Sequence, residues 1–223
     1  FATAEQPLVV YHGDFNQDGV WDFIETEYGE NGQLYAKRHL SAMATAMPWL
    51  TERLQNYGQY SKTPLLDLFA PTFEKQMKRF EIRTLESIVF IQNGGIFEPK
   101  ALPIKAQFSS AFCPVVADFN NDGSEDIFIS QNEFSLHPEE SREDAGLGLL
   151  MLGDGKGSFR ALSISESGLV VPGEGRGSAA ADFDHDGRTD LLVAQNGSTP
   201  RLFKNQTKRT GLRVILRGDE QNP

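Results

Sequence analysis

The alternation of apolar and polar residues predicts short β-strands over most of the chain. Residues 8–12 (Leu-Val-Val-Tyr-His) and 87–91 (Ser-Ile-Val-Phe-Ile) are rich in β-branched and aromatic side chains, which favour strands. Further strands are predicted at residues 23–28, 33–35, 97–103, 111–117, 127–130, 147–152, 159–164, 191–194, 201–203 and 212–216. Glycine-rich turns separate these runs, so the pattern indicates a mainly β protein built from antiparallel strands.

One region departs from this pattern. Between residues 36 and 82 the apolar positions recur at spacings of three and four, which is typical of one face of a helix. Pro48, Pro64 and Pro71 each fit the first turn of a new helix, so they divide the region into short helices. The apolar positions are Leu40, Met43, Ala44, Met47, Leu50, Leu54 and Tyr57, then Phe73, Met77 and Phe80 in the last helix. We predict a packed helical insertion here, with a ligand groove as the alternative.

Three stretches of nine residues repeat one arrangement of polar side chains between predicted strands. They are residues 14–22 (Asp-Phe-Asn-Gln-Asp-Gly-Val-Trp-Asp), residues 118–126 (Asp-Phe-Asn-Asn-Asp-Gly-Ser-Glu-Asp) and residues 182–190 (Asp-Phe-Asp-His-Asp-Gly-Arg-Thr-Asp). Oxygen-bearing side chains stand at loop positions 1, 3, 5 and 9, Phe stands at position 2 and Gly at position 6. Because Ca²⁺ prefers about six to eight oxygen ligands, each loop predicts a calcium site.

The order of strands and loops predicts a repeated unit. Each loop lies between two predicted strands, and a second pair of strands follows before the next loop once the insertion is set aside. Four antiparallel strands per repeat, arranged radially, form a blade of a β-propeller. The sequence therefore predicts about three propeller blades with an α-helical insertion.

Charge and composition narrow the choice of partners and location. The net charge of −10 argues against a nucleic-acid partner, and the three loops account for much of the excess acid. No stretch approaches the roughly 18 apolar residues of a membrane span, so we expect a protein that does not span a membrane. Weak calcium loops need extracellular calcium levels, which favours a secreted, periplasmic or cell-surface protein.

The residues around the third loop resemble a known family. Residues 181–194 (Ala-Asp-Phe-Asp-His-Asp-Gly-Arg-Thr-Asp-Leu-Leu-Val-Ala) resemble the FG-GAP or VCBS repeat, the calcium-bearing blade of integrin α-subunit propellers and of many bacterial surface proteins. The glycine-rich turns before Phe97 and Phe159 are similar to the second hairpin of that repeat. Residues 201–205 and 211–218 resemble the start of the ASPIC/UnbV segment, which follows such repeats in cartilage acidic protein and its bacterial relatives.

The resemblance implies a division of the chain. Residues 1–35 and 83–207 would be propeller blades, residues 36–82 the helical insertion, and residues 208–223 the start of an ASPIC/UnbV-like segment. Propellers of this family close with about seven blades, so we expect the chain to be part of a larger ring.

The resemblance also implies the metal ligands, which would be the side chains at positions 1, 3, 5 and 9 and the carbonyl oxygen at position 7. The first site would use Asp14, Asn16, Asp18, the carbonyl of Val20, and Asp22. The second would use Asp118, Asn120, Asp122, the carbonyl of Ser124, and Asp126, and the third Asp182, Asp184, Asp186, the carbonyl of Arg188, and Asp190. The Phe at position 2 (Phe15, Phe119 and Phe183) is expected to point into the interior.

Two other interpretations of the loops are open. An EF-hand places a bidentate Glu at position 12, where Glu25 stands in the first loop, but Ile129 and Val193 stand there in the others. An EF-hand also requires a helix on each side, whereas strands are predicted here. Alternatively, the loops are solvated turns without metal, although their carboxylates would then repel one another.

The function expected from these observations is extracellular binding. No Ser/His/Asp set, nucleophile elbow or phosphate loop is present, so we expect no enzymatic activity. The prediction is a module for protein or glycan binding or adhesion, with about three structural Ca²⁺ ions. The alternatives are the propeller scaffold of a polysaccharide-active enzyme (a lyase, dehydratase or hydrolase) and a surface protein whose copies self-associate into a ring or filament.

Overall fold

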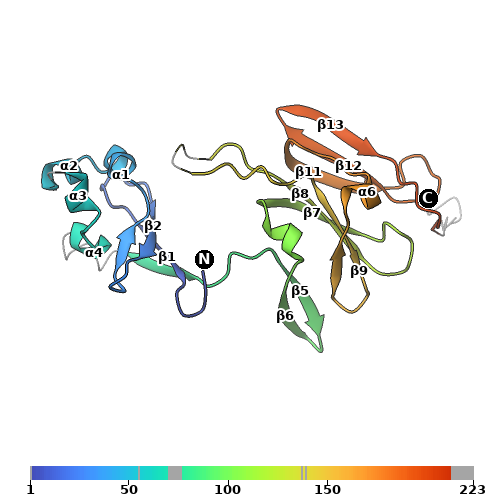
Figure 1. Cartoon of the computed structure of the whole chain (residues 1–223), viewed down its shortest axis with the longest axis horizontal. Helices are drawn as coiled ribbons and strands as arrows, with labels where there is room; N and C mark the ends of the chain where they lie inside the picture. The colour runs from blue at the N-terminus through green and yellow to red at the C-terminus, as the bar shows by residue number, and fades with distance from the viewer. Residues whose placement is uncertain (1, 55, 70–76, 137, 139, 212–223) are drawn as a thin grey trace, which may run out of the picture. The chain divides into compact units, whose positions relative to one another are not determined.

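The mainly β prediction is confirmed by the structure (Figure 1). The computed structural model describes residues 2–54, 56–69, 77–136, 138 and 140–211. These residues form four antiparallel sheets and several short helices. In this described part of the chain, no helix is long and apolar enough to cross a membrane. The chain divides into two compact units, residues 1–85 and residues 86–223.

The N-terminal unit contains a four-stranded antiparallel sheet with the order β3-β2-β1-β4. Its strands are β1 (Leu8–Gly13), β2 (Asp22–Tyr28), β3 (Leu34–Ala36) and β4 (Lys78–Ile82). The first nine-residue loop connects β1 to β2. The strands predicted at residues 8–12, 23–28 and 33–35 are therefore confirmed, with boundaries shifted by one residue.

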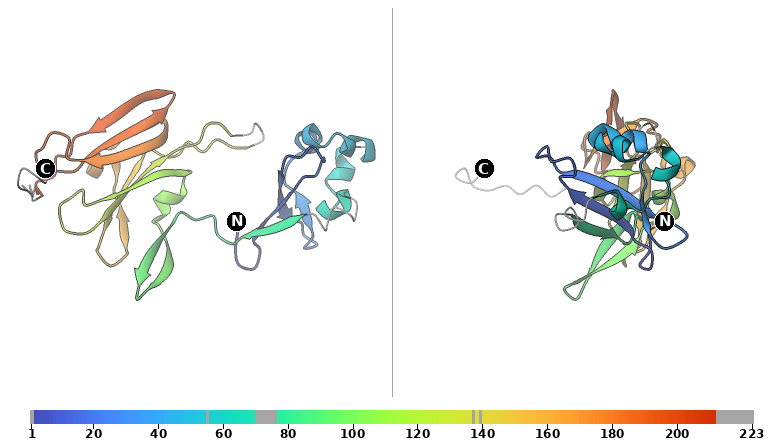
Figure 2. Two further views of the ribbon diagram at one scale, coloured as in Figure 1. Left: turned by 180° about the vertical axis from the view of Figure 1, so that it is seen from behind. Right: turned by 90° about the vertical axis from the view of Figure 1, so that its left-hand side faces the viewer.

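Four short helices cover one face of this sheet (Figure 2). They are α1 (Leu40–Ala46), α2 (Trp49–Arg53), α3 (Tyr57–Tyr60) and α4 (Leu65–Leu68). Alternate strand residues such as Val9 and Ile24 pack against apolar helix residues in one core. Met43 and Met47 are buried in that core, so they are packing residues rather than the lining of a groove.

The helix predicted across residues 71–80 is wrong in its second half. Residues 78–82 form β4, which pairs with β1 in a register that places Phe80 opposite Val10. The spacing of Met77 and Phe80 fits a helix, but the pairing with β1 is a contact between distant residues that local periodicity does not reveal. Residues 70–76, with Phe73 and the start of the predicted helix, lie outside the described residues.

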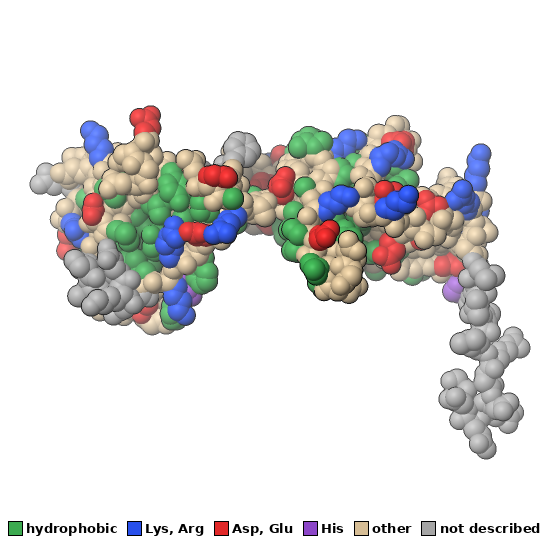
Figure 3. All heavy atoms as spheres, turned by 90° about the horizontal axis from the view of Figure 1, so that it is seen from below, with side chains coloured by type: hydrophobic (Ala, Val, Ile, Leu, Met, Phe, Trp, Pro, Cys, Tyr) green, Lys and Arg blue, Asp and Glu red, His purple; other side chains and the backbone are tan. Residues whose placement is uncertain are grey.

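The opposite face of the N-terminal sheet carries exposed aromatic side chains. His12 stacks between Trp21 and Phe23, with ring centroids 4.4 and 4.3 Å away, and both of these neighbours are exposed. Figure 3 shows hydrophobic side chains gathered on one side of this unit with basic and acidic groups beside them.

The C-terminal unit contains the remaining three sheets. A hairpin is formed by β5 (Ile88–Asn93) and β6 (Ile96–Ala101). A four-stranded sheet follows in consecutive order: β7 (Ala111–Ala117), β8 (Asp126–Gln131), β9 (Leu149–Gly153) and β10 (Phe159–Ala161). The last described sheet contains β11 (Glu174–Ala181), β12 (Asp190–Asn196) and β13 (Ser198–Phe203).

These sheets stack on both faces of β8, all of whose residues are buried. One core joins Ile127 and Ile129 of β8 to Val89 of the β5–β6 hairpin. The other core joins Phe128 of β8 to Leu191 and Val193 of β12. A strand that lies between two packed sheets needs apolar side chains on both of its faces. In β8, Ile127 and Ile129 point to one face and Phe128 points to the other.

Two short helices connect the sheets: the 3₁₀-helix η1 (Ile104–Gln107) and the α-helix α6 (Ile164–Ser167). The strand predicted at residues 159–164 ends early at Ala161. Ser163 and Glu166 form a capping box, which starts α6 instead.

The prediction of four strands per repeat is confirmed for the second repeat only. In the first repeat, β5 and β6 pair with each other and not with β2 among the described residues, while β3 and β4 complete the sheet of β1 and β2. In the third repeat the described part has three strands, and residues 212–216 lie outside it. A bulge interrupts the pairing of β11 with β12 between Gly175 and Gly177.

Candidate metal centres

All three loops connect adjacent antiparallel strands. The residue before each loop pairs with the aspartate at position 9, as Gly13↔Asp22, Ala117↔Asp126 and Ala181↔Asp190. The two ends of each loop are thus fixed by the sheet ladder. This arrangement excludes the EF-hand alternative, which requires a helix on each side of the loop.

The backbone of the three loops turns in the same way. Position 4 has a positive φ of 61°, 53° and 62° (Gln17, Asn121 and His185), and position 6 has a φ of 85°, 90° and 82° (Gly19, Gly123 and Gly187). A φ near 85° is readily adopted by glycine alone, which explains the Gly at position 6 of each loop. Two left-handed residues two positions apart curl the chain so that its alternate side chains converge.

The same backbone hydrogen bonds hold the aspartates in every loop. The position 1 carboxylate accepts the N–H of position 5 at 3.1, 3.1 and 2.9 Å in the first, second and third loops. It also accepts the N–H of position 6, at 3.0, 2.8 and 3.0 Å. The position 5 carboxylate accepts the N–H of position 7 at 2.7, 2.8 and 3.0 Å. The position 9 carboxylate accepts the N–H of position 2 at 3.2, 2.9 and 3.0 Å.

These hydrogen bonds leave room for a cation. A carboxylate has about four lone-pair sites, so an oxygen that accepts one N–H can still coordinate a metal. The donor set consists only of carboxylate, amide and carbonyl oxygens, which suits a hard cation such as Ca²⁺. The residues of the loops therefore fit the predicted ion in chemical type.

Position 3 distinguishes the first two loops from the third. In the first two, the amides of Asn16 and Asn120 accept the N–H of position 5 at 3.1 and 2.9 Å and donate to the position 5 carboxylate at 2.9 Å. In the third loop the acidic Asp184 stands there and accepts a hydrogen bond from Lys204. The third loop consequently has four carboxylates at its implied ligand positions, where each of the others has three.

The position 9 aspartate of the second loop is the most enclosed acid of the site. Asp126 is 0 % exposed and accepts hydrogen bonds from the N–H groups of Phe119 and Gly153, both at 2.9 Å. Burial raises the pKa of the Asp126 carboxyl, and the charges of Asp122 and Asp118 add to this rise, while the two hydrogen bonds oppose it. A nearby cation would offset this repulsion.

The neighbouring Asp122 carboxyl is shifted in the opposite direction. Its pKa is lowered, first by the hydrogen bond from the backbone N–H of Ser124 and then by the one from Asn120. Asp122 is therefore held ionised in an orientation set by its own loop.

The third loop brings three acids together. One carboxylate oxygen from each of Asp182, Asp184 and Asp190 lies within 4.8 Å of the others, a spacing compatible with a shared metal ion. Of the residues implied as ligands, these are the carboxylates that the structure gathers this closely among the described part of the chain.

Two basic side chains balance the charge of this third loop. Arg188 donates to Asp186 at 2.8 Å, and the Lys204 ammonium contacts Asp184 and lies 3.4 Å from Asp186. Hydrogen bonds with Asp184 and Asp186 raise the pKa of Lys204. Partial burial would raise the pKa of Asp186, but the basic neighbours Arg188 and Lys204 outweigh it and lower that pKa.

The prediction that Phe at position 2 points inward holds for two loops and is wrong for the third. Phe15 packs against Phe69 with ring centroids 5.1 Å apart, and Phe119 is 5 % exposed in the core between the two larger sheets. Phe183, in contrast, is 70 % exposed. Phe119 is covered because the sheet of β11–β13 packs beside it, whereas no described sheet covers Phe183.

Three functional contacts were missed at the sequence level. The N–H of Gly153 donates to Asp126, the N–H of Asn205 donates to Asp190 at 2.8 Å, and Lys204 binds Asp184. All three residues stand at or just after the end of the third strand of their repeat, β9 or β13. Alignment of the repeats by their third strands, instead of by their loops alone, is the signal that would have found them.

Asn205 also joins two loops. Its side-chain amide donates to the carbonyl of Phe119 at 2.7 Å and to that of Thr189 at 2.9 Å. The second and third loops are thus tied to one another through this residue. The fold and the loops together define a mainly β protein with three aspartate loops of one geometry.

Comparison of the chain with models of protein families finds no match, and a search of curated proteins finds no match either.

Proposed function

We propose that the protein is a calcium-binding β-propeller module of the FG-GAP/VCBS type that binds a protein or a glycan outside the cell, with calcium in a structural role. The observation that carries this proposal is the repetition of one loop geometry three times. The same two positive φ angles and the same carboxylate–backbone hydrogen bonds recur between antiparallel strands. Solvated turns that serve only to reverse the chain have no need of four oxygen side chains in register.

The C-terminal unit supports a propeller arrangement. Sheets stacked face to face, each a meander of consecutive antiparallel strands, are what neighbouring propeller blades present. The first strands of two such sheets, β7 and β11, lie side by side, since the N–H of Ser178 donates to the Cys113 sulfur at 3.1 Å. Arg176 of β11 also stacks on Phe112 of β7 with the guanidinium carbon 3.9 Å from the ring centroid.

The proposed role of each ion is to neutralise a carboxylate cluster and to pin the two strands that enter and leave it. Calcium that binds only the folded state, at about 100 times its Kd, adds roughly 2.7 kcal/mol of stability per site. The aspartates of the three loops are all engaged in this role, and the proposal includes no catalytic activity. The ASPIC/UnbV-like identity of residues 208–223 is part of the same proposal.

Thermal unfolding with and without calcium tests the proposal. We expect the melting temperature to rise with added millimolar calcium and to fall in excess chelator, because calcium stabilises the folded state alone. Asp118→Asn removes a carboxylate from the second loop and should reduce this shift.

Asp154→Asn is the matched control. Asp154 accepts two backbone N–H bonds, from Lys156 at 2.8 Å and Ser158 at 2.9 Å, as Asp118 does, but it lies in a hairpin turn outside the loops. It should leave the calcium-induced shift unchanged. Equal melting temperatures in calcium and in chelator would refute the structural role of the ion.

A further inference from the structure

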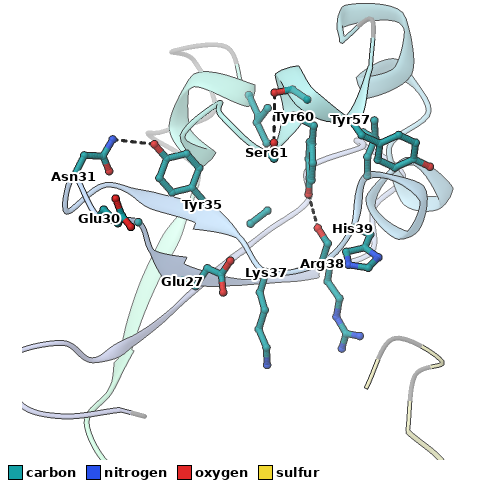
Figure 4. Close-up of a pocket in the computed structure, with 15 residues that line it drawn as sticks. Glu27, Glu30, Asn31, Tyr35, Lys37, Arg38, His39, Tyr57, Tyr60 and Ser61 are labelled. Carbon is teal, nitrogen blue, oxygen red and sulfur yellow. Dashed lines mark hydrogen bonds between the residues drawn. The ribbon is translucent and has the colours of Figure 1, made fainter. Parts of the chain in front are cut away.

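The N-terminal unit contains a cavity that is separate from the metal loops. Its volume is about 880 Å³, and the residues that line it come from the turn after β2, from β3 and from α3 and its surroundings (Figure 4). This volume lies within the range of about 300–1,000 Å³ that is common for small-ligand sites. No residue of the first loop is among those that line it.

Three tyrosines give the cavity aromatic walls. Figure 4 shows the rings of Tyr35 and Tyr60 on either side of the space, with Tyr57 beyond Tyr60. The Tyr35 hydroxyl accepts a hydrogen bond from Asn31 at 2.9 Å, and the Tyr60 hydroxyl donates to the carbonyl of Arg38 at 2.6 Å. These bonds hold two of the rings in place. Tyr60 is only 8 % exposed and forms part of the wall, so the rings of Tyr35 and Tyr57 offer the flat apolar faces for the C–H side of a ligand.

The third ring, that of Tyr57, lies largely in solvent. Tyr57 is 63 % exposed at the first position of α3, so most of its surface is available to a ligand. Since little of this side chain is packed against the protein, its replacement should affect ligand contact rather than folding.

The charged groups of the cavity balance one another. Glu27, Glu30, Lys37 and Arg38 are all among the lining residues, and Lys37 is also paired with Glu25 at 3.2 Å. Two acids and two bases give no net attraction for an anion or a cation. They do supply acceptors and donors for hydroxyl groups, which can act in both ways.

We propose that this cavity binds a short neutral oligosaccharide. Sugar rings would stack on Tyr35 and Tyr57 by their apolar faces, and their hydroxyl groups would donate to the carboxylates and accept from the basic groups. The proposal rests on the proposed function only in taking the protein to be a binding module, and it names the ligand class and the site. The ligand would not contact the calcium loops, because no residue of the first loop lines the cavity.

The test is titration of the whole chain, in calcium-containing buffer, with defined sugars. The probes are neutral trisaccharides of β-1,4-linked glucose, xylose and mannose and of α-1,4-linked glucose, with β-linked glucuronate-containing and α-linked galacturonate trimers as acidic counterparts. We expect saturable binding of at least one neutral trimer by calorimetry, and binding of the acidic trimers weaker by about tenfold or more. Tighter binding of an acidic trimer, or no saturable binding of any neutral one, overturns the proposal.

Two variants locate the binding. Tyr57→Ala should weaken the affinity for the best neutral trimer by about tenfold, the loss expected for one aromatic contact, whereas Tyr57→Trp should retain it. Phe97→Ala is the matched control, because Phe97 is also 63 % exposed but lies in β6 of the C-terminal unit. Equal affinities for Tyr57→Ala and Phe97→Ala would show that the sugar does not bind in the cavity.

The same samples separate this proposal from that for calcium. If the melting temperature depends on calcium but no sugar binds, the sugar site is refuted and the calcium role is not. Sugar binding together with a melting temperature that ignores chelator refutes the calcium role alone.

Discussion

The second and third loops share a backbone and differ in their surroundings. Both have the same pair of positive φ angles and the same hydrogen bonds to the aspartates at positions 1, 5 and 9. In the second, Phe119 is buried and the buried Asp126 carries a raised pKa. In the third, Phe183 is exposed and Lys204 and Arg188 pair with the acids.

The comparison shows that the shape of such a loop is set by its own residues, while its energetics are set by what packs around it. The second loop depends on the sheet that covers it and holds its charges close together. The third loop has basic side chains where a cation would otherwise balance the acids. We therefore expect the second loop to matter more for stability and to bind calcium more strongly.

The largest expected difference between the two loops is the loss of stability when the Phe at position 2 is replaced. Phe119→Ala should lower the free energy of unfolding by about 3–5 kcal/mol, because it leaves a cavity in the core between two sheets. Phe183→Ala should change it by less than about 0.5 kcal/mol, because that ring is mostly exposed. Urea denaturation in calcium measures both, and equal effects would contradict the comparison.

The next largest difference is the loss of stability when the Asp at position 9 is replaced. Asp126→Ala leaves the buried N–H of Phe119 and the partly buried N–H of Gly153 without an acceptor, so it should lower the free energy of unfolding by about 2–4 kcal/mol. Asp190→Ala should lower it by about 1–2 kcal/mol, because the two N–H groups that it leaves without an acceptor, those of Phe183 and Asn205, are both partly open to water. Chemical denaturation in chelator isolates this effect from metal binding. A larger loss for Asp190→Ala would reverse the predicted order of the two loops.

The pairing of Lys204 can be broken directly. Lys204→Gln removes the ammonium from Asp184, so the calcium affinity of the third loop should rise by about three- to tenfold as the site gains uncompensated charge. In chelator the variant should unfold at nearly the same urea concentration as the original protein, since Lys204 is more than half exposed and water screens its ion pairs. Calorimetric titration with calcium measures the affinity, with Lys208→Gln as the control. An unchanged affinity would mean that Lys204 does not compete with the ion.

The smallest expected effect on stability concerns Glu166, a carboxylate outside the loops with which the loop aspartates can be compared. Hydrogen bonds from the backbone and side chain of Ser163, and then from Arg160, lower the pKa of Glu166 from 4.5 to about 2. Because the pKa is depressed in the folded state, its stabilising contribution is present above pH 4.5 and is lost as the pH falls toward about 2.

Glu166→Gln should therefore make the fall in unfolding free energy over this pH range shallower, while the capping geometry is kept. Denaturation at a series of pH values in chelator checks this. An identical pH dependence in the variant and the original protein would show that Glu166 is not perturbed.

Much of the fold could be predicted from local pattern, and the errors have a common cause. The strands beside the loops have clear β-branched runs, as in residues 127–130, and the helix breaks at Pro48 and Pro64 follow from proline geometry. The strand at residues 78–82 was missed because its partner, β1, is about seventy residues earlier in the chain. The hairpin of β5 and β6 was expected beside β2 because the repeat was extended across the insertion.

In the candidate metal sites, too, the features set by nearby residues could be predicted and those set by distant residues could not. The positions of the aspartates and glycines within each loop could be predicted, since they depend on the conformation of nine consecutive residues. The exposure of Phe183 and the contact of Lys204 with Asp184 could not, because both depend on which distant segments pack against the loop. Repeats that are alike in sequence need not have like neighbours.

The most direct test of the central claim is a count of calcium ions bound per chain by equilibrium dialysis at millimolar calcium. Three loops of one geometry predict about three ions, with the third loop the weakest and its site lost first as calcium is lowered. Asp118→Asn should lower the count by one, and Asp154→Asn should leave it unchanged. No bound calcium, or a count that is the same in both variants, would contradict the interpretation of these loops as metal sites.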